Sequence, residues 1–119
     1  MHALKTGRLI ACAVHCGLVL ASPSVEIDTA LRTFARELGL LFQIVDDILD
    51  VAGSEEDLGK AVGGDARHGK VTYVSAHGLD GARALAEQVH GRATQALSPL
   101  GDAGADLMSI ADLTFARRH

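Results

Sequence analysis

The sequence has few aromatic residues and no tryptophan: 119 residues contain one tyrosine and three phenylalanines. The formal net charge is -4, and the chain has no basic stripe. Proteins that bind nucleic acid usually carry a basic face, often with aromatic side chains that stack on the bases. This composition therefore gives no reason to expect a nucleic-acid partner.

Cysteine is also scarce. The chain contains only Cys12 and Cys16, which are four residues apart. Two cysteines one helical turn apart form neither a disulfide framework nor the four-ligand set of a structural zinc site. Reduced thiols in a cytoplasmic protein are the simplest interpretation.

No hydrophobic run is long enough to cross a bilayer. The stretch 9–21 is apolar apart from His15, but it is shorter than the roughly 20 residues that a transmembrane helix requires. The N-terminus also lacks the layout of a signal peptide. We therefore expect the stretch to be a helix that is apolar on most sides, and a helix of this kind needs several neighbours. A chain of this length has few helices to supply them.

Alanine, leucine and valine dominate, and 48% of the residues are hydrophobic. This composition favours close-packed helices, so we predict an all-α fold in which residues 1–119 form part of one domain. The predicted helices cover about 3–21, 25–51, 72–76, 80–97 and 105–117, with a glycine-rich polar stretch from 53 to 70.

The longest predicted helix has the clearest boundaries and the clearest apolar stripe. Ser24 is expected to cap its start, and Gly53 is expected to end it. Its apolar residues recur every three or four positions, as expected of one buried helix face. They are Ile27, Leu31, Phe34, Leu38, Leu41, Val45 and Ile48.

The later helices are also expected to bury one face each. Asp80 is the expected cap of the helix that reaches residue 97, and Arg117 is expected near the C-terminal end of the last helix, where cations are favourable. The expected inward residues are Ala84, Leu85, Val89 and Ala96 in the first of these helices, and Leu107, Ile110, Leu113 and Thr114 or Phe115 in the second.

Three carboxylates occur among apolar residues near the end of the longest predicted helix: Asp46, Asp47 and Asp50. Together with Gln43 they are spaced by three and four residues, so they share a face. The simplest alternative is a solvated acidic helix end. However, acids at a helix C-terminus oppose the helix dipole, and the neighbours here are apolar. A hard cation would remove the repulsion, and Mg²⁺ fits best because it takes one or two carboxylates and completes its shell with water and phosphate oxygens.

Lysines that follow or precede glycines supply the complementary charge. Lys60 and Lys70 each follow a glycine in the polar stretch, and Lys5-Thr6 precedes Gly7. Each lysine alone is consistent with an ordinary surface residue. Lysines combined with a magnesium-binding carboxylate cluster indicate a bound diphosphate.

These motifs, in this order, resemble the C-terminal half of the trans-type polyprenyl diphosphate synthases, the family of farnesyl and geranylgeranyl diphosphate synthases. The first segment resembles the family's KTG motif, and the aspartate segment resembles its second aspartate-rich motif, FQxxDDxLD. The downstream glycine-lysine pairs resemble its lysine loop. The matching segments are Lys5 to Ile10, Phe42 to Asp50, and Leu58 to Thr72.

The resemblance implies an isoprenoid-synthase helical bundle, present here in part, and a role for each matching residue. Mg²⁺ would bind Asp46, Asp47 and Asp50. The diphosphate of an allylic substrate would contact Lys5, Thr6, Gln43, Lys60 and Lys70, with Lys5 and Lys60 also catalytic. The family reaction ionises this diphosphate and joins the allylic cation to isopentenyl diphosphate. Complete members of the family are expected to be homodimers.

The chain departs from the family pattern because the first aspartate-rich motif and the basic residues that hold isopentenyl diphosphate are absent from it. Three readings follow. The chain is the C-terminal part of a prenyltransferase, inactive by itself, with the missing N-terminal half as its partner. Alternatively, it is a non-catalytic partner subunit that supplies or modifies half of a heteromeric synthase, or a small all-α interaction module without chemistry.

Overall fold

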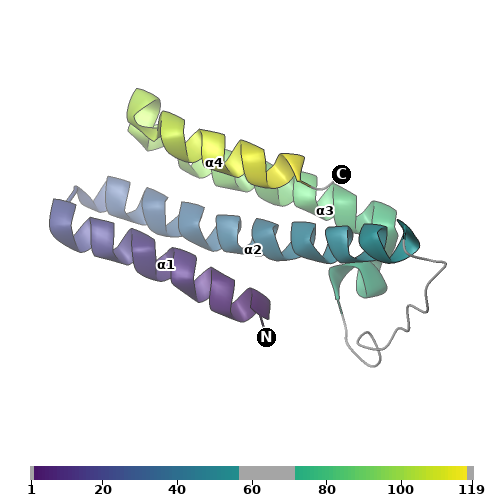
Figure 1. The fold of residues 1–119 in the computed structure, drawn as a ribbon. Coiled ribbons are helices and arrows are strands. Elements are labelled where there is room, and N and C mark those ends of the chain that lie inside the picture. Colours follow the sequence, from purple (N-terminus) through teal and green to yellow (C-terminus); the bar gives the residue numbers. More distant parts are fainter. Residues whose placement is uncertain (1, 57–71, 118–119) are drawn as a thin grey trace.

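The computed structural model describes residues 2–56 and 72–117, with side chains from residue 5 to 53 and from 72 to 117. Its regular elements are all helical, which confirms the predicted all-α class for this part of the chain (Figure 1). They are α1 (His2–Ala21), α2 (Val25–Glu56), α3 (Tyr73–Ala96), the 3₁₀ helix η2 (Ser98–Gly104) and α4 (Ala105–Ala116). None of these described helices is both long enough and apolar enough to span a membrane.

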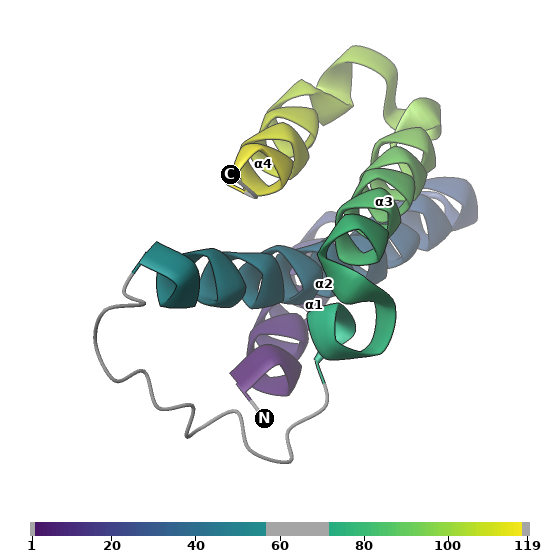
Figure 2. The ribbon, with the colours of Figure 1, turned by 90° about the vertical axis from the view of Figure 1, so that its right-hand side faces the viewer.

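Helix α2 is the centre of the structure. Helix α1 lies along one side of it, while α3 and α4 lie on the other side (Figures 1 and 2). The predicted apolar stripe is confirmed, since five of its seven members are buried and the other two are half-buried. Two packed clusters lie along the stripe. One joins α2 to α3 as far as Val89, and the other joins α2 to the end of α3 and to α4.

The predicted start of α2 is confirmed, whereas its predicted end is wrong. The Ser24 hydroxyl accepts a hydrogen bond from the Ile27 N–H at 3.3 Å, as an N-cap does. The helix then continues through Gly53 to Glu56. A glycine inside a helix costs only about 1 kcal/mol relative to alanine, so the flanking helical turns outweigh it.

Helix α3 starts with a capping box and then breaks. The Thr72 hydroxyl accepts from the Ser75 N–H at 3.0 Å, and the Ser75 hydroxyl accepts from the Thr72 N–H at 2.7 Å. Gly78 has φ +79°, in the left-handed region that favours glycine, and it separates a first turn from the rest of α3. The predicted short helix and the longer one after it are therefore both present, with the break two residues before Asp80.

The buried faces of α3 and α4 differ in part from those predicted. Val89 is buried as expected, but Ala84 is exposed. In α4 the residues Ile110 and Leu113 are 46% and 69% exposed, whereas Thr114 is buried. Helix α4 is apolar around much of its circumference, so its sequence does not distinguish the face that packs. The full buried set in the two helices is Ala82, Ala86, Val89, Ala93, Ala111 and Thr114.

An ion pair also joins α2 to α3. The Glu37 side chain is only 11% exposed, and its Oε1 accepts a hydrogen bond from Arg92 Nε at 3.0 Å. A mostly buried carboxylate needs a partner of this kind, because an unpaired charge is costly away from water. The pair therefore links α2 to the C-terminal part of α3.

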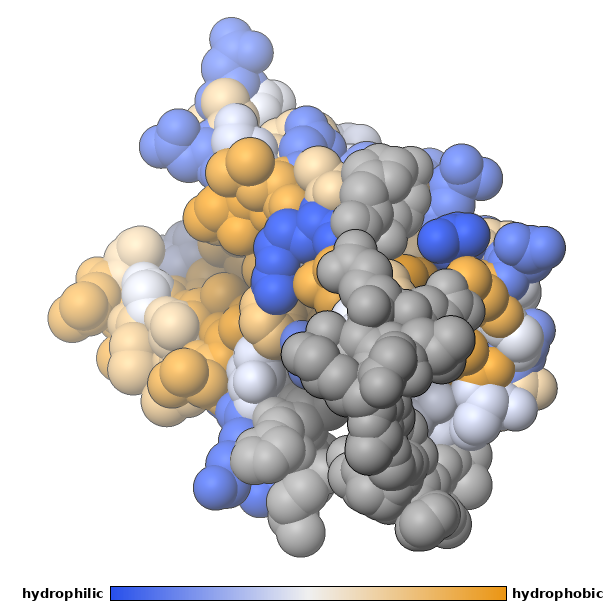
Figure 3. Space-filling view, turned by 45° about the vertical axis from the view of Figure 1, so that its right-hand side comes forward, coloured by the Kyte–Doolittle hydropathy of each residue, from blue (hydrophilic) through white to orange (hydrophobic). Residues whose placement is uncertain are grey.

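Helix α1 is the least enclosed helix. Among the described elements it contacts only α2, through a face that includes the buried Leu18. Leu9, Val19 and Leu20 are 71%, 65% and 88% exposed. Figure 3 shows hydrophobic surface at the left edge of the molecule, on the side where α1 turns into α2 in Figure 1. The expectation that this helix needs more neighbours than the chain supplies is therefore confirmed for the described residues.

Candidate functional site

The structure describes six of the predicted site residues. They lie on two helices, with Lys5 and Thr6 on α1 and Gln43, Asp46, Asp47 and Asp50 on α2. Lys60 and Lys70 lie outside the described residues. The described part of the candidate site therefore consists of the contact between α1 and α2 and of the residues around the aspartates.

The aspartate turn, residues 46–50, lies beside the best-packed part of α2. Asp46 and Asp47 are half-buried, and Asp50 is exposed. Their neighbours Val45 and Ile48 are fully buried on the core side of the same helix. The carboxylates thus lie at the border between core and solvent, because the helical spacing that turns the apolar residues inward leaves them at the edge.

Asp47 has a role that the sequence did not reveal. Its Oδ2 accepts a hydrogen bond from the Tyr73 N–H at 3.0 Å. Tyr73 is the first residue of α3, so this carboxylate lies at a helix N-terminus, where unpaired N–H groups and the dipole favour negative charge. Asp47 therefore joins the end of α2 to the start of α3. The capping residues Thr72 and Ser75 were the only local signal, and they did not identify a partner 26 residues away.

A close helix contact places the Lys5-Thr6 pair. A Cβ atom added to Gly39 would lie 3.2 Å from the Gly7 Cα, so the two backbones nearly touch. Gly39 lies one helical turn before Gln43. Since α1 runs antiparallel to α2, Lys5 and Thr6 lie on the α1 segment beside the second half of α2, which carries the aspartates (Figure 1). Lys5 is exposed and Thr6 is half-buried.

A further cation approaches the same part of α2 from α4. The guanidinium carbon of Arg117 lies 4.9 Å from the centroid of the Phe42 ring, in the geometry of a cation–π contact. Phe42 lies one helical turn before Asp46. The nearby end of α4 is held to α3 by His90, whose Nε2 is 2.8 Å from the Asp112 Oδ1 and whose ring stacks on Phe115.

The aspartate turn offers carboxylate oxygens of the kind that Mg²⁺ prefers, but not enough of them to complete the coordination shell of the ion. Within residues 2–56 and 72–117, no three histidine, cysteine, aspartate or glutamate side chains are grouped to hold a metal ion. Mg²⁺ usually takes one or two carboxylates, and water and phosphate oxygens complete its shell. Asp46 and Asp50 are four residues apart on the same helix face as Asp47, and one oxygen of Asp47 accepts the Tyr73 N–H.

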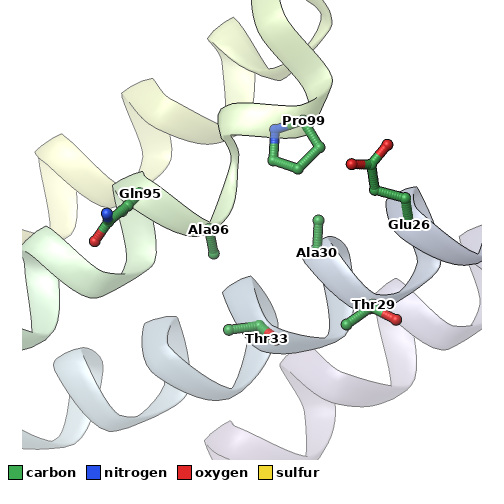
Figure 4. A pocket seen from close by; sticks show the side chains of 7 residues that line it. All are labelled: Glu26, Thr29, Ala30, Thr33, Gln95, Ala96 and Pro99. Atoms are coloured by element: carbon green, nitrogen blue, oxygen red, sulfur yellow. The ribbon is translucent and has the colours of Figure 1, made fainter.

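An open pocket of about 420 Å³ lies elsewhere, between the start of α2 and the end of α3 (Figure 4). Ala30 lines it and is 16 residues before Asp46, which is about 24 Å along a helix. The pocket is therefore separate from the aspartate turn. Its lining is mainly small and uncharged, and consists of Glu26, Thr29, Ala30, Thr33, Gln95, Ala96 and Pro99.

Comparison with known proteins connects this arrangement to one family. The family model described as polyprenyl synthetase matches residues 1–102. The match includes α1, α2, α3 and most of η2, and it stops before α4. It also includes every residue that the motifs singled out.

Curated relatives give the same result. The chain is 37% identical over 119 residues to a dimethylallyltranstransferase of Fischerella ambigua, and 40% identical over 120 residues to the farnesyl diphosphate synthase of Bacillus subtilis. Each match covers 100% of this chain, but only 34% and 40% of the respective relatives. Geranylgeranyl pyrophosphate synthase 9 of Arabidopsis thaliana is 42% identical over 97 residues, which is 82% of this chain and 27% of that protein. The chain thus spans roughly a third of the length of the relatives that it matches.

Proposed function

Since the chain belongs to the polyprenyl synthetase family, we propose that it carries the magnesium and allylic-diphosphate half of a prenyl diphosphate synthase. The observation that supports this most is the close contact of Gly7 with Gly39. It brings the helix with Lys5 and Thr6 against the helix with Gln43 and the aspartates. The contact places two helices that carry motifs far apart in the sequence next to each other, which supports the proposal.

In this proposal the acidic residues bind Mg²⁺, and the basic and uncharged polar residues bind the diphosphate. Asp46, Asp47 and Asp50 are the proposed ligands of Mg²⁺, and one oxygen of Asp47 also accepts the N–H at the start of α3. Lys5, Thr6 and Gln43 contact the diphosphate from the two helices. Lys60 and Lys70 are proposed as further diphosphate contacts, and Lys5 and Lys60 as catalytic groups.

The proposed chemistry is the departure of diphosphate from an allylic substrate. Bound Mg²⁺ would stabilise the negative charge that develops on the leaving group. Lysine side chains would add fixed positive charge to the same oxygens, and interactions that strengthen as charge develops lower the barrier. Apolar helix walls would keep water from the allylic cation. Attack by isopentenyl diphosphate requires a second substrate site, which we assign to the remainder of the family fold.

A non-catalytic partner subunit of a heteromeric synthase is the alternative, and a small interaction module is the third reading. Both predict that the chain binds a partner but gains nothing from substrate. The proposed half-site predicts binding of allylic diphosphate by the chain itself. Substrate-dependent stability therefore separates the proposed half-site from the other two.

The test is thermal unfolding of the purified chain with Mg²⁺ and dimethylallyl diphosphate. A ligand at ten times its Kd stabilises the folded state by about 1.4 kcal/mol, which corresponds to about 6 °C for a domain of this size. We expect this shift in the unaltered chain and its loss in the Asp46→Ala/Asp50→Ala variant. Asp102→Ala is the matched control, because Asp102 is an exposed acid on η2, away from the aspartate turn. No shift, or an equal shift in the double variant, would refute the half-site.

Catalysis needs a separate measurement. We expect no product from the isolated chain with an allylic primer and radiolabelled isopentenyl diphosphate, and clear product would show that the missing part of the fold is not required. The cytoplasmic location also stays a prediction, because matched relatives from Arabidopsis thaliana are named as chloroplastic or mitochondrial.

A further inference from the structure

The start of α3 is a separate unit of the helix, residues 73–77, which we call the first turn of α3. Gly78 divides it from the rest of α3, with φ +79° and ψ 165°, a combination that is open almost only to glycine. Within the first turn the rings of Tyr73 and His77 are stacked, with centroids 6.4 Å apart and planes at 13°. Because of the break, contacts other than the longer part of α3 must hold this turn in place.

The first turn is held against the second half of α2 by two kinds of contact (Figures 1 and 2). Tyr73 and Val74 pack against the buried cluster that includes Ile48. The Tyr73 N–H also donates to Asp47 Oδ2 at 3.0 Å. Apolar packing has no preferred direction, whereas a hydrogen bond does. The hydrogen bond therefore determines how the Asp47 carboxylate is oriented.

The capping box fixes the peptide group that makes this hydrogen bond. The Tyr73 N–H and the Thr72 carbonyl belong to one planar peptide group. The Thr72 carbonyl oxygen accepts from the Ser75 hydroxyl and from the Ala76 N–H, both at 3.0 Å. The Thr72 hydroxyl in turn accepts from the Ser75 N–H at 3.0 Å. With its carbonyl held by the first turn, the peptide group has its N–H directed at Asp47.

A hydrogen bond to one carboxylate oxygen also gives the other oxygen a defined direction. Asp47 Oδ2 accepts the Tyr73 N–H, which limits rotation of the carboxylate and so fixes the direction of Oδ1. Groups that hold a metal ligand in this way strongly affect metal affinity, and their loss typically weakens it by about 10- to 100-fold. The contacts around Asp47 thus bear on the proposed metal site as well as on the packing of α3.

We propose that Thr72 and Ser75 are positioning residues for the metal site. They hold the peptide group whose N–H orients Asp47, and Asp47 is one of the proposed ligands of Mg²⁺. This inference rests on the proposed function, because it concerns how the same site is held. It extends the site to the first turn of α3, which acts through a backbone N–H.

The experiment measures how much Mg²⁺ the full chain requires. Thermal unfolding is followed while Mg²⁺ is titrated at a fixed, saturating concentration of dimethylallyl diphosphate, and the Mg²⁺ concentration that gives half of the maximal shift is determined. We expect this concentration to rise about fivefold in Thr72→Ala, less than for loss of a group bonded directly to a ligand, because Thr72 acts through the peptide group. Ser75→Ala should have a similar effect.

Two controls separate positioning from a general loss of stability. Thr72→Ser retains a capping hydroxyl, so its Mg²⁺ requirement should stay within about twofold of that of the unaltered chain. Ser24→Ala removes the cap of α2, which lies 22 residues before Asp46, or about 33 Å along a helix. It should lower the unfolding temperature by a few degrees, as Thr72→Ala does, but leave the Mg²⁺ requirement within about twofold.

Amide hydrogen exchange provides a readout without metal or diphosphate. Compared with Ser24→Ala, Thr72→Ala should speed exchange of the Tyr73 N–H by at least about threefold, because the peptide group is no longer held. Exchange at Val89 should be the same in both variants, since Val89 lies beyond the break at Gly78 and is fully buried. Equal exchange of the Tyr73 N–H in the two variants would overturn the positioning role.

The titration distinguishes this inference from the proposed function. Stabilisation of the unaltered chain, together with equal Mg²⁺ requirements in Thr72→Ala and Ser24→Ala, would keep the half-site and overturn the positioning role. A requirement in Thr72→Ser as high as that in Thr72→Ala would also overturn it, because the hydroxyl would then have no part. An unaltered chain that is not stabilised at any Mg²⁺ concentration would overturn both.

Discussion

The second half of α2 and the outer face of α1, opposite the face that packs on α2, differ in where they place polar and apolar side chains. On α2 three carboxylates border residues such as Val45 and Ile48 that are fully buried. On α1 the large apolar side chains of Leu9 and Leu20 are exposed instead, and no acid occurs in the helix. One region places polar groups next to core, and the other places core-like groups in solvent.

The difference shows which described helices have neighbours that cover their apolar side chains. Helix α2 has neighbours on both sides, so its apolar stripe is satisfied and the acids at its edge have a defined environment. Among the described helices, α1 contacts only α2. Its sequence suits a helix with more neighbours, and the described part of the chain supplies only α2.

The largest expected effect comes from truncating the satisfied region. Leu41 is fully buried on α2, so Leu41→Ala should lower the free energy of unfolding by about 3 kcal/mol. Leu20 is 88% exposed on α1, so Leu20→Ala should change it by less than about 0.5 kcal/mol. Urea unfolding of both variants checks the contrast. A large loss for Leu20→Ala would mean that the isolated chain already covers the outer face of α1, for instance by pairing with itself.

A smaller effect should separate two adjacent acids. Asp47→Ala removes the acceptor of the Tyr73 N–H and should cost about 1 kcal/mol without any metal. Asp46→Ala mainly relieves repulsion between neighbouring carboxylates and should stay within about 0.5 kcal/mol of the unaltered chain.

Amide hydrogen exchange supplies the specific measurement for this pair. The Tyr73 N–H should exchange faster in Asp47→Ala than in Asp46→Ala, because only the first variant removes its acceptor. Equal exchange and equal stability would show that Asp47 does not hold the start of α3.

The smallest expected effect is a gain at the turn between the two contrasted helices. Ser22 has φ +47°, a left-handed conformation that costs a residue with a side chain about 1 kcal/mol. Ser22→Gly should therefore raise the unfolding temperature by about 2 °C, after allowance for the greater freedom of glycine in the unfolded chain. Ser24→Gly is the control of opposite sign, since it removes the α2 cap and should cost a few tenths of a kcal/mol. A loss of stability in Ser22→Gly would contradict the assigned strain.

The sequence predicted the helices better than it predicted their faces. The α2 stripe is regular and made of large residues, so its period identified the buried side. Helix α3 buries mostly alanines such as Ala82 and Ala86, which contrast little with the small exposed Ala84. Helix α4 has large apolar residues all round, so tertiary packing alone decides that Leu113 is exposed.

The helix positions of the candidate site residues could be predicted from the sequence, but the contacts between the helices that carry them could not. Local spacing placed Gln43 and the aspartates on one helix face. The contact of Gly7 with Gly39, the hydrogen bond from Tyr73 to Asp47 and the approach of Arg117 to Phe42 all join segments that are distant in the sequence. No local pattern encodes such pairings, because they depend on how whole helices cross.

The contact between Gly7 and Gly39 also determines how stiffly α1 is held. The helix packs along α2, and its backbone contact at Gly7 and its covalent turn at Ser22 lie about 22 Å apart along its axis. A helix that is held near both ends has little freedom to tilt against its neighbour. The exposed side of α1 between these two points is therefore held in a fixed position relative to α2. A Cβ atom at Gly39 would press on the Gly7 backbone, so it would push α1 away from α2 at this point and let the start of α1 tilt.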